Sequence, residues 1–512
     1  MSGSAWPPEG FRWVEQDGAA MPGEEPRSTV GAGSGAIVGG DERGVARRTH
    51  KRRWWSAGAA AVLVVVLAAG GLAIWRSHQG GAHLPAAPIG TPQDLLVGFP
   101  LGRQPIPSWK VTPDDIGLPP DVMVGDLFAS SGTKAYFVTS CRSSCADPIS
   151  WVYGLDTATG ARLFAPVPLP GLYSAYGANC YNNGPSVGLC VTAGGDQRSV
   201  WVIDLDRGAV TFTGPTDLLY QGVPGAGPIL AAVGDYRGAS RLVAAVKGKG
   251  VYGIGPHAEL TWFVPGGGTL NTGDRLQVGD IPPLTIAVQF PAEDHSGHTQ
   301  TYRVFSVVDG TDLTPAPPPG TTLHEAVVYN GGFAYQYVGD KSSGVTFYDT
   351  NGRLVATEHT SDPAELAFPM ANTGMPTVLA ESQYDVYTAN GKVIAKIPAH
   401  EMSTDFKTIG TKIYVRQSGE SAVPTSWQQW DLLTGEPGAI CQLDLGFGYV
   451  ASDGEVILVR THEDEPTIQA INTSDCHTLW ETPARASVWK VGTGLIQRNY
   501  PGDSIVGLRP PS

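Results

Sequence analysis

One short phrase recurs about eight times between residue 150 and the C-terminus, and it constrains the fold more than any other feature. Each copy has a β-rich run, then Asp or Asn, two further residues, a Thr/Asn/Asp-Gly turn, and a hydrophobic or aromatic run. The clearest copy runs from Trp151 to Phe164, and a copy from Gln469 to Trp480 keeps its register with Cys in place of Gly. The residues at the turn are Gly160, Gly208, Ala258, Gly310, Gly352, Gly391, Gly435 and Cys476.

The spacing of these turns is typical of β-propeller blades. Successive turn residues are 48, 50, 52, 42, 39, 44 and 41 residues apart, and a period of about 40–50 residues with strand patterning indicates a blade in each unit. Gly supplies the positive φ that a tight hairpin needs, and Asp or Asn binds its own downstream backbone. The terminal Phe or Trp of a copy can pack between adjacent blades. We therefore predict an all-β domain over residues 105–512.

The phrase resembles the Ala-x-Asp-x-x-Thr-Gly-Lys-x-x-Trp repeat of the quinoprotein-like (PQQ-like repeat) β-propeller family, over roughly residues 105–510. The resemblance implies an eight-bladed propeller of four-stranded antiparallel blades. The family includes pyrroloquinoline-quinone alcohol dehydrogenases and a non-enzymatic outer-membrane assembly lipoprotein. The dehydrogenases place adjacent cysteines beside their cofactor, and this chain has no Cys-Cys pair. We therefore expect a non-enzymatic, membrane-anchored member that binds no cofactor.

The two ends of the domain are predicted to share one blade. Three strand-like runs, 487–491, 494–498 and 504–508, follow the last turn and lack an outermost partner. Near the start, Pro107 to Val111 resembles the aromatic strand that ends other blades. Pairing these ends would remove open sheet edges. Eight phrases plus a shared blade make nine, so the predicted number of blades is between seven and nine. The irregular copy around Asp309 is the one that could form less than a full blade.

A transmembrane helix is predicted from Trp54 to Trp75. This 22-residue stretch has no charge and a Trp at each end, so it is long enough to span a bilayer and carries interfacial anchors. Five basic residues lie between 47 and 53, whereas only Arg76 follows closely. The positive-inside rule then places the N-terminus in the cytoplasm and the large domain outside. A cleaved signal peptide is the alternative, but its charged leader would be unusually long.

Four segments and a set of partners follow from this topology. We expect a disordered cytoplasmic tail over 1–53, the transmembrane helix over 54–75, a linker over 76–104 and an extracytoplasmic propeller over 105–512. The net charge is −14, and because residues 1–53 with Arg76 are positive overall, the remainder carries −16. This acidity disfavours nucleic acid as a partner. We expect the lipid bilayer to bind the helix, and another envelope protein or a glycan to bind the propeller.

The six cysteines are candidates for disulfides. All lie outside the membrane on this topology, and an even number in an exported domain favours disulfide bonds. Six cysteines can be fully paired in 15 ways, and locality suggests one of these sets of three bonds. The suggested pairs are Cys141–Cys145, Cys180–Cys190, and Cys441–Cys476 between neighbouring blades.

No catalytic, cofactor-binding or metal-binding residue can be nominated from the sequence. Loops at 293–298 and 462–465 combine His with Asp and Glu, but we interpret both as solvated loops. No His-Glu-x-x-His or phosphate-binding Gly-x-x-x-x-Gly-Lys motif occurs. We therefore expect a single-pass protein of the cytoplasmic membrane whose propeller is a binding or scaffolding module. The alternative is a quinone-dependent or otherwise unrecognised envelope enzyme, an oxidoreductase or a hydrolase.

Overall fold

The chain divides into two compact units, residues 1–82 and 83–512. The computed structural model describes residues 89–512, except 142–148, 172–178, 193–197, 221–226, 235–239, 271–283, 292–301, 361–364, 367–373, 381, 400–401, 418–424, 447, 462–465, 484–485 and 500–502. The predicted tail and transmembrane helix, 1–75, lie outside the described residues. Within the described part, no helix has both the length and the apolar character needed to cross a bilayer.

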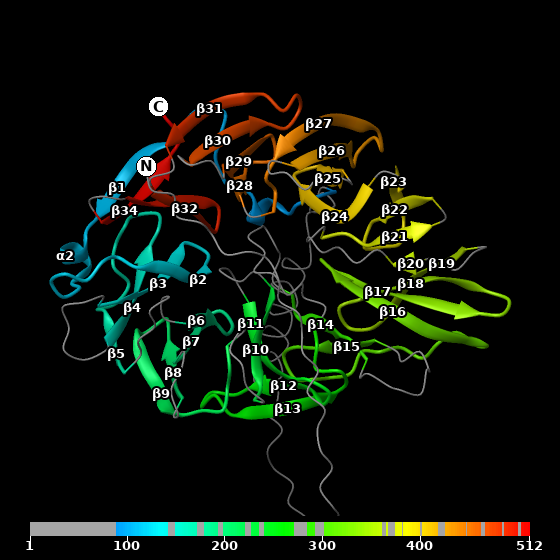
Figure 1. Cartoon of the computed structure of the whole chain (residues 1–512), viewed down its shortest axis with the longest axis horizontal. Helices are drawn as coiled ribbons and strands as arrows, with labels where there is room; N and C mark the ends of the chain where they lie inside the picture. Colours follow the sequence, from blue (N-terminus) through cyan, green and yellow to red (C-terminus); the bar gives the residue numbers. More distant parts are fainter. Residues whose placement is uncertain are drawn as a thin grey trace, which may run out of the picture. The chain divides into compact units, whose positions relative to one another are not determined.

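The second unit is built from antiparallel sheets that follow one another around a ring in chain order (Figure 1). Apart from β1, the first half of the chain gives five sheets. Blade 1 is β2 (Asp126–Ser131), β3 (Lys134–Ser140), β4 (Ile149–Asp156) and β5 (Val167–Pro170); blade 2 is β6 (Asn179–Asn182), β7 (Val187–Val191), β8 (Ser199–Asp204) and β9 (Ala209–Pro215); blade 3 is β10 (Ile229–Gly234), β11 (Ser240–Val246), β12 (Gly250–Ile254) and β13 (Leu260–Pro265); blade 4 is β14 (Ile286–Gln289) and β15 (Arg303–Ser306); blade 5 is β16 (Thr321–Tyr329), β17 (Gly332–Gly339), β18 (Ser343–Asp349) and β19 (Leu354–Thr360).

The second half gives four more sheets, and two short helices precede blade 1. Blade 6 is β20 (Glu365–Leu366), β21 (Thr377–Ala380), β22 (Gln383–Tyr387) and β23 (Val393–Pro398); blade 7 is β24 (Met402–Ile409), β25 (Lys412–Gln417), β26 (Thr425–Asp431) and β27 (Pro437–Leu443); blade 8 is β28 (Tyr449–Ser452), β29 (Val456–Arg460), β30 (Thr467–Asn472) and β31 (Thr478–Pro483); blade 9 is β32 (Ala486–Val491), β33 (Gly494–Asn499), β34 (Ser504–Arg509) and β1 (Ile106–Val111). The helices are η1 (Gln93–Leu95) and α2 (Pro113–Ile116).

Eight of these sheets have four strands, which confirms the predicted blade type. The sheet with two described strands is blade 4, which contains the irregular phrase around Asp309. Single β-bridges flank it, from Leu270 to Gln289 and from Phe305 to Asp312, so short outer segments complete it. The total is nine, at the upper end of the predicted range. The recurring turn occurs eight times because it joins the third and fourth strands of a blade, and the ninth blade has no such turn since its third and fourth strands are the two ends of the domain.

The recurring phrase forms the turn between the third and fourth strand of a blade. All eight predicted turn residues have positive φ, including the non-glycine residues Ala258 at 59° and Cys476 at 61°. The Asp that opens the turn accepts hydrogen bonds from backbone two and three residues later. At Asp156, for example, Oδ1 accepts from the amides of Ala158 and Thr159 at 2.9 and 3.2 Å. The turns therefore have the positive φ and the Asp hydrogen bonds that the sequence predicted.

Aromatic side chains in the outer strand, or between the turn and that strand, pack against the turn of the next blade, as predicted. A Cβ added at Gly160 would lie 2.7 Å from the Trp109 ring, and one added at Gly208 would lie 2.2 Å from Phe164. The indole N–H of Trp109 also donates to the carbonyl of Thr157, at 2.9 Å. Glycine is therefore required at these two turns for two reasons, its backbone conformation and the close approach of a ring.

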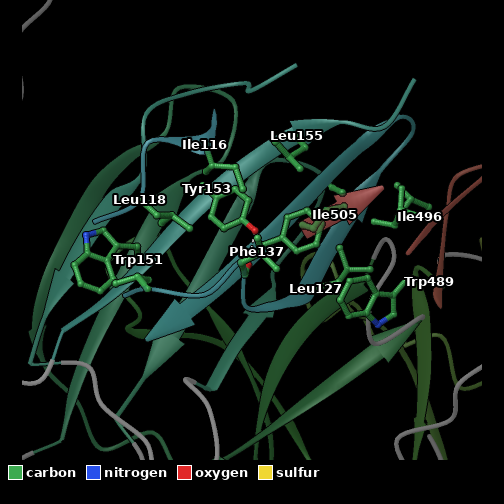
Figure 2. Packing of buried hydrophobic residues seen from close by; sticks show 14 of the residues in the cluster. Ile116, Leu118, Leu127, Phe137, Trp151, Tyr153, Leu155, Trp489, Ile496 and Ile505 are labelled. Carbon is green, nitrogen blue, oxygen red and sulfur yellow. Dashed lines mark hydrogen bonds between the residues drawn. The ribbon is translucent and has the colours of Figure 1, made fainter. Parts of the chain in front are cut away.

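The hydrophobic core consists of clusters between adjacent sheets. Figure 2 shows the cluster at the junction of blades 9 and 1, where Phe137 and Tyr153 of blade 1 stack at 5.1 Å and Trp489 of blade 9 lies against Phe137 at 6.0 Å. The middle strands of blades are buried, whereas outer strands such as β9 and β31 are largely exposed. This is the expected burial of sheets that stack face to face around an axis.

The ring closes by pairing of the two ends of the domain. Strand β1 pairs antiparallel with β34, from Ile106 opposite Arg509 to Val111 opposite Ile505. The strands β32, β33 and β34 complete this blade, so the predicted shared blade is confirmed. In Figure 1 the N-terminal strand β1 lies beside β34. The inner strand of blade 9, β32, contacts the inner strand β2 of blade 1.

The described end of the predicted linker, 89–104, is bound to the propeller. We call residues 89–102 the strap. Its amides at Thr91, Val97 and Gly98 donate to the carbonyls of Gly410, Ser452 and Thr493, at 2.7–2.8 Å, so it crosses blades 7, 8 and 9. Its Leu101 is fully buried. The apolar residues of the strap, which lie among Gly and Pro, therefore belong to the core. The composition of this segment had predicted a linker.

Candidate functional site

The structure places the candidate disulfide cysteines in bonds. Cys180 pairs with Cys190 between the opposed strands β6 and β7, and Cys441 pairs with Cys476 between blades 7 and 8. Cys141 is also disulfide-bonded, while Cys145 lies outside the described residues. No free cysteine is present among the residues that the structure covers. The two described pairings are those suggested from locality.

The two His-containing acidic loops considered for metal binding, 293–298 and 462–465, lie outside the described residues. In the part of the chain that is described, no group of three or more His, Cys, Asp or Glu side chains is arranged to hold a metal ion.

Buried basic side chains join one blade to the next. Arg498 of blade 9 is only 2% exposed, and its Nη1 lies 2.9 Å from Oδ1 of Asp126 in blade 1. Its Nη2 lies 3.7 Å from Asp503. A buried guanidinium requires such carboxylate partners, because desolvation of an unpaired charge is costly. These ion pairs therefore join blades 9 and 1 where the ring closes, and loss of a carboxylate partner would leave the buried guanidinium uncompensated.

A second basic residue, Lys407 of blade 7, is also buried. Its Nζ donates to the carbonyl of Leu445, at 3.0 Å, and lies 3.8 Å from the ring centroid of Tyr449 in blade 8. This cation–π contact again crosses from one blade to its neighbour. These buried charges therefore have a structural role, which is to join neighbouring blades.

A pocket of about 310 Å³ lies beside the closing junction. It is formed by the connection from β1 to β2 and by the turn between β33 and β34. In a four-stranded antiparallel blade, the second-to-third turn and the connection to the next blade lie at the same end, which we call the connection face. The strap, in contrast, binds first-to-second turns at the opposite end. The lining residues are Thr112, Pro113, Asp114, Pro119, Pro120, Asp121, Val122, Met123 and Asp503.

Local sequence fixes the shape of this pocket. Thr112 and Asp115 form a reciprocal capping box at the start of α2, and Gly117 ends the helix in the left-handed conformation. The hydrogen bonds of Asp115 to Thr112 lower the pKa of its carboxyl. Asp503 Oδ2 accepts from the amide of Val124 at 2.9 Å, which ties the two walls together. The pocket lining combines the apolar side chains of Pro, Val122 and Met123 with the exposed carboxylates of Asp114 and Asp121.

One buried phenol binds the backbone next to the pocket lining. The hydroxyl of Tyr153 donates to the carbonyl of Val124. Burial raises the pKa of Tyr153 well above its ordinary value, so the group stays neutral and serves as a hydrogen-bond donor. None of the pocket residues was predicted from the sequence. Their only signals were Pro and Asp in 112–123, which are also typical of an ordinary connection between blades.

Comparison with known proteins gives one family and several similar folds. The family described as "Conjugation-associated 9-bladed beta-propeller domain" matches residues 82–511. The uncharacterized protein D806_5234 of Mycolicibacterium smegmatis (strain MKD8) is 32% identical over 449 residues, which cover 82% of this chain and 88% of that protein.

Solved propellers are similar at much lower identity. BamB from Moraxella catarrhalis is 10% identical with a TM-score of 0.35, covering 79% of this chain and 100% of that chain. A europium-containing methanol dehydrogenase is 13% identical with a TM-score of 0.33, covering 79% of this chain and 86% of that chain. Values this low carry no argument about activity.

Proposed function

Because the chain belongs to the family of conjugation-associated nine-bladed β-propeller domains, we propose that it is a non-enzymatic binding or scaffolding module of a conjugation apparatus at the cell envelope. The structural observation that carries this proposal is that buried charged side chains join neighbouring blades. Arg498 and Lys407 each join two blades. Such a ring is a rigid support for surface loops.

The location at the envelope rests on the sequence. The uncharged stretch from Trp54 to Trp75 is the membrane anchor, and the basic residues before it keep the N-terminus in the cytoplasm. Disulfides persist in oxidising compartments, and the bonds of Cys180–Cys190 and Cys441–Cys476 fit a propeller outside the membrane.

The partner is proposed to bind the connection face. This face carries the pocket beside α2, where Pro119, Val122 and Met123 supply apolar surface and Asp114 and Asp121 supply negative charge. The propeller and adjoining segments after residue 76 carry −16, so an envelope protein with a basic, partly apolar segment complements this surface. The strap occupies turns at the opposite end of blades 7–9.

Photocrosslinking in native membranes tests this function. A photoreactive amino acid replaces exposed Asp114 at the pocket, and in a matched control it replaces exposed Thr213 on the outer strand β9. We expect a defined envelope protein to be captured from position 114 and not from position 213. Identical products at both positions, or no product at position 114, would contradict docking at the connection face.

A further inference from the structure

The bond between Cys441 and Cys476 lies in an unusual polar setting. Gln429 of β26 is fully buried, and its Nε2 donates to Sγ of Cys441 at 2.8 Å and to Sγ of Cys476 at 3.4 Å. The Nζ of Lys412 donates to Oε1 of the same Gln429, at 3.0 Å. A chain of donors therefore runs from an ammonium group through a buried amide to the two sulfur atoms.

The other described disulfide has an apolar setting. Cys180 and Cys190 are 3% and 0% exposed and lie in a cluster with Phe128, Tyr136 and Trp201. No described side chain donates a hydrogen bond to either sulfur. The two disulfides can therefore be compared within one chain. One lies beside hydrogen-bond donors, and the other lies among apolar side chains.

Donors aimed at sulfur favour the reduced state of the bond. A disulfide sulfur is a weak acceptor, whereas a thiolate carries a full charge and accepts strongly. The Gln429 amide therefore stabilises a thiolate on Cys441 more than it stabilises the disulfide. The contact from Lys412 polarises this amide further, because hydrogen bonds in a chain strengthen one another. A thiol stabilised in this way leaves faster during exchange.

Access differs between the two sulfur atoms of this bond. Cys441 is 1% exposed, whereas Cys476 is partly buried in a hairpin turn whose neighbours Ser474 and Asp475 are exposed. An external thiolate therefore reaches Cys476 first. The group that leaves is then the thiolate of Cys441, the sulfur that Gln429 contacts at the shorter distance.

From this geometry we propose that Cys441–Cys476 is a thiol–disulfide exchange site for a dithiol reductant. One thiolate of the reductant attacks Sγ of Cys476, forms a mixed disulfide with it and releases Cys441 as a thiolate held by Gln429. The second thiol of the reductant then attacks the mixed disulfide. This step oxidises the dithiol to its own disulfide and leaves Cys441 and Cys476 reduced, with two electrons transferred.

The exchange loosens one defined junction of the ring. Blade 7 has Ala439 where blades 1 and 3 carry Phe164 and Trp262, so the disulfide takes the place of an aromatic contact between blades. After reduction, the Nζ of Lys412 still donates to the carbonyl of Thr473 in blade 8, at 2.6 Å. The blades therefore stay in register while their covalent link opens and closes with the redox state outside.

Graded reduction of the full-length protein tests the proposal. Native protein is exposed to dithiothreitol for increasing times, trapped with an alkylating reagent and mapped by mass spectrometry. We expect Cys441 and Cys476 to be labelled at least about tenfold faster than Cys180 and Cys190, the factor that corresponds to a hydrogen bond to a charged group. Equal rates, or faster loss of Cys180–Cys190, would overturn the proposal.

Two further measurements separate the donor from simple exposure. With a monothiol, the mixed disulfide should be found on Cys476, and its appearance on Cys441 would contradict the proposed order of attack. Gln429→Met should reduce the rate ratio of the two bonds by about tenfold, whereas Gln428→Met, which alters the neighbouring side chain bound to Gly438, should not. An unchanged ratio in Gln429→Met would rule out the donor chain.

Discussion

Replacing Leu101 by Ala should destabilise the propeller, although a free linker would tolerate it. The side chain of Leu101 is 0% exposed and packs with Val97, Leu458 and Leu495. Its amide donates to Asp453, and its carbonyl accepts from the Trp480 indole at 2.8 Å. Both bonds use the backbone and survive the substitution. The expected loss is therefore that of a buried Leu alone, about 3 kcal/mol of unfolding free energy.

Thermal unfolding of the full-length protein measures this loss. The unfolding entropy is about 2.1 cal/mol/K per residue, so about 3 kcal/mol lowers the Tm of a unit of about 430 residues by roughly 3 °C. The matched control is Leu433→Ala, because Leu433 is 64% exposed and its truncation should change the Tm by less than about 0.5 °C. Equal, negligible shifts for both variants would refute the packing of the strap.

Three further outcomes are expected. Deletion of 504–512 removes β34 and leaves β1 without its partner, so expression trials should yield no folded propeller; an unchanged melting curve would show that closure is not required. Burial raises the pKa of Tyr387 to about 12. Its contribution to stability is therefore complete below about pH 10 and is lost as the pH rises from about 10 to about 12, which denaturant titrations followed by phenolate absorbance should detect. A reporter active only outside the membrane should work after Ser512 and fail before residue 50, and the reverse would contradict the proposed topology.

Local chemistry explains why the blades could be predicted. The positive φ at Gly160 or Gly435 and the hydrogen bonds of Asp156 are properties of a few adjacent residues. Their repetition at 39–52 residue intervals then defines the architecture. Pairing of β1 with β34 could also be predicted, because an open sheet edge at each end needs a partner.

Contacts between distant residues explain what the sequence did not reveal. Leu101 and Trp480 are 379 residues apart, and no local pattern links them. In other blades a Trp indole bonds the turn of the next blade, as Trp262 does with Val308 at 3.2 Å. Blade 9 has no such turn, because its third and fourth strands are the two ends of the domain. The carbonyl of Leu101 takes the place of the turn, which is why a segment with the composition of a linker is part of the core.

The pocket and its support were hidden for the same reason. Arg498 and Asp126 are 372 residues apart, and Asp503 reaches Val124 across 379 residues. The disulfides were accessible to prediction because each described pair joins neighbouring strands or neighbouring blades. Burial of a Gln beside Cys441 required the structure.

A mating assay tests directly whether this propeller serves conjugation by binding a partner at its connection face. DNA transfer is measured with the chain deleted in the donor, in the recipient or in both, and then restored as the full chain, as Asp114→Lys at the pocket, or as Thr213→Lys on β9. Both variants change exposed side chains, so their amounts in the membrane should match. We predict that deletion lowers transfer, and that the full chain and Thr213→Lys restore it while Asp114→Lys does not. Transfer that is unaffected by deletion, or restored equally by Asp114→Lys, would contradict it.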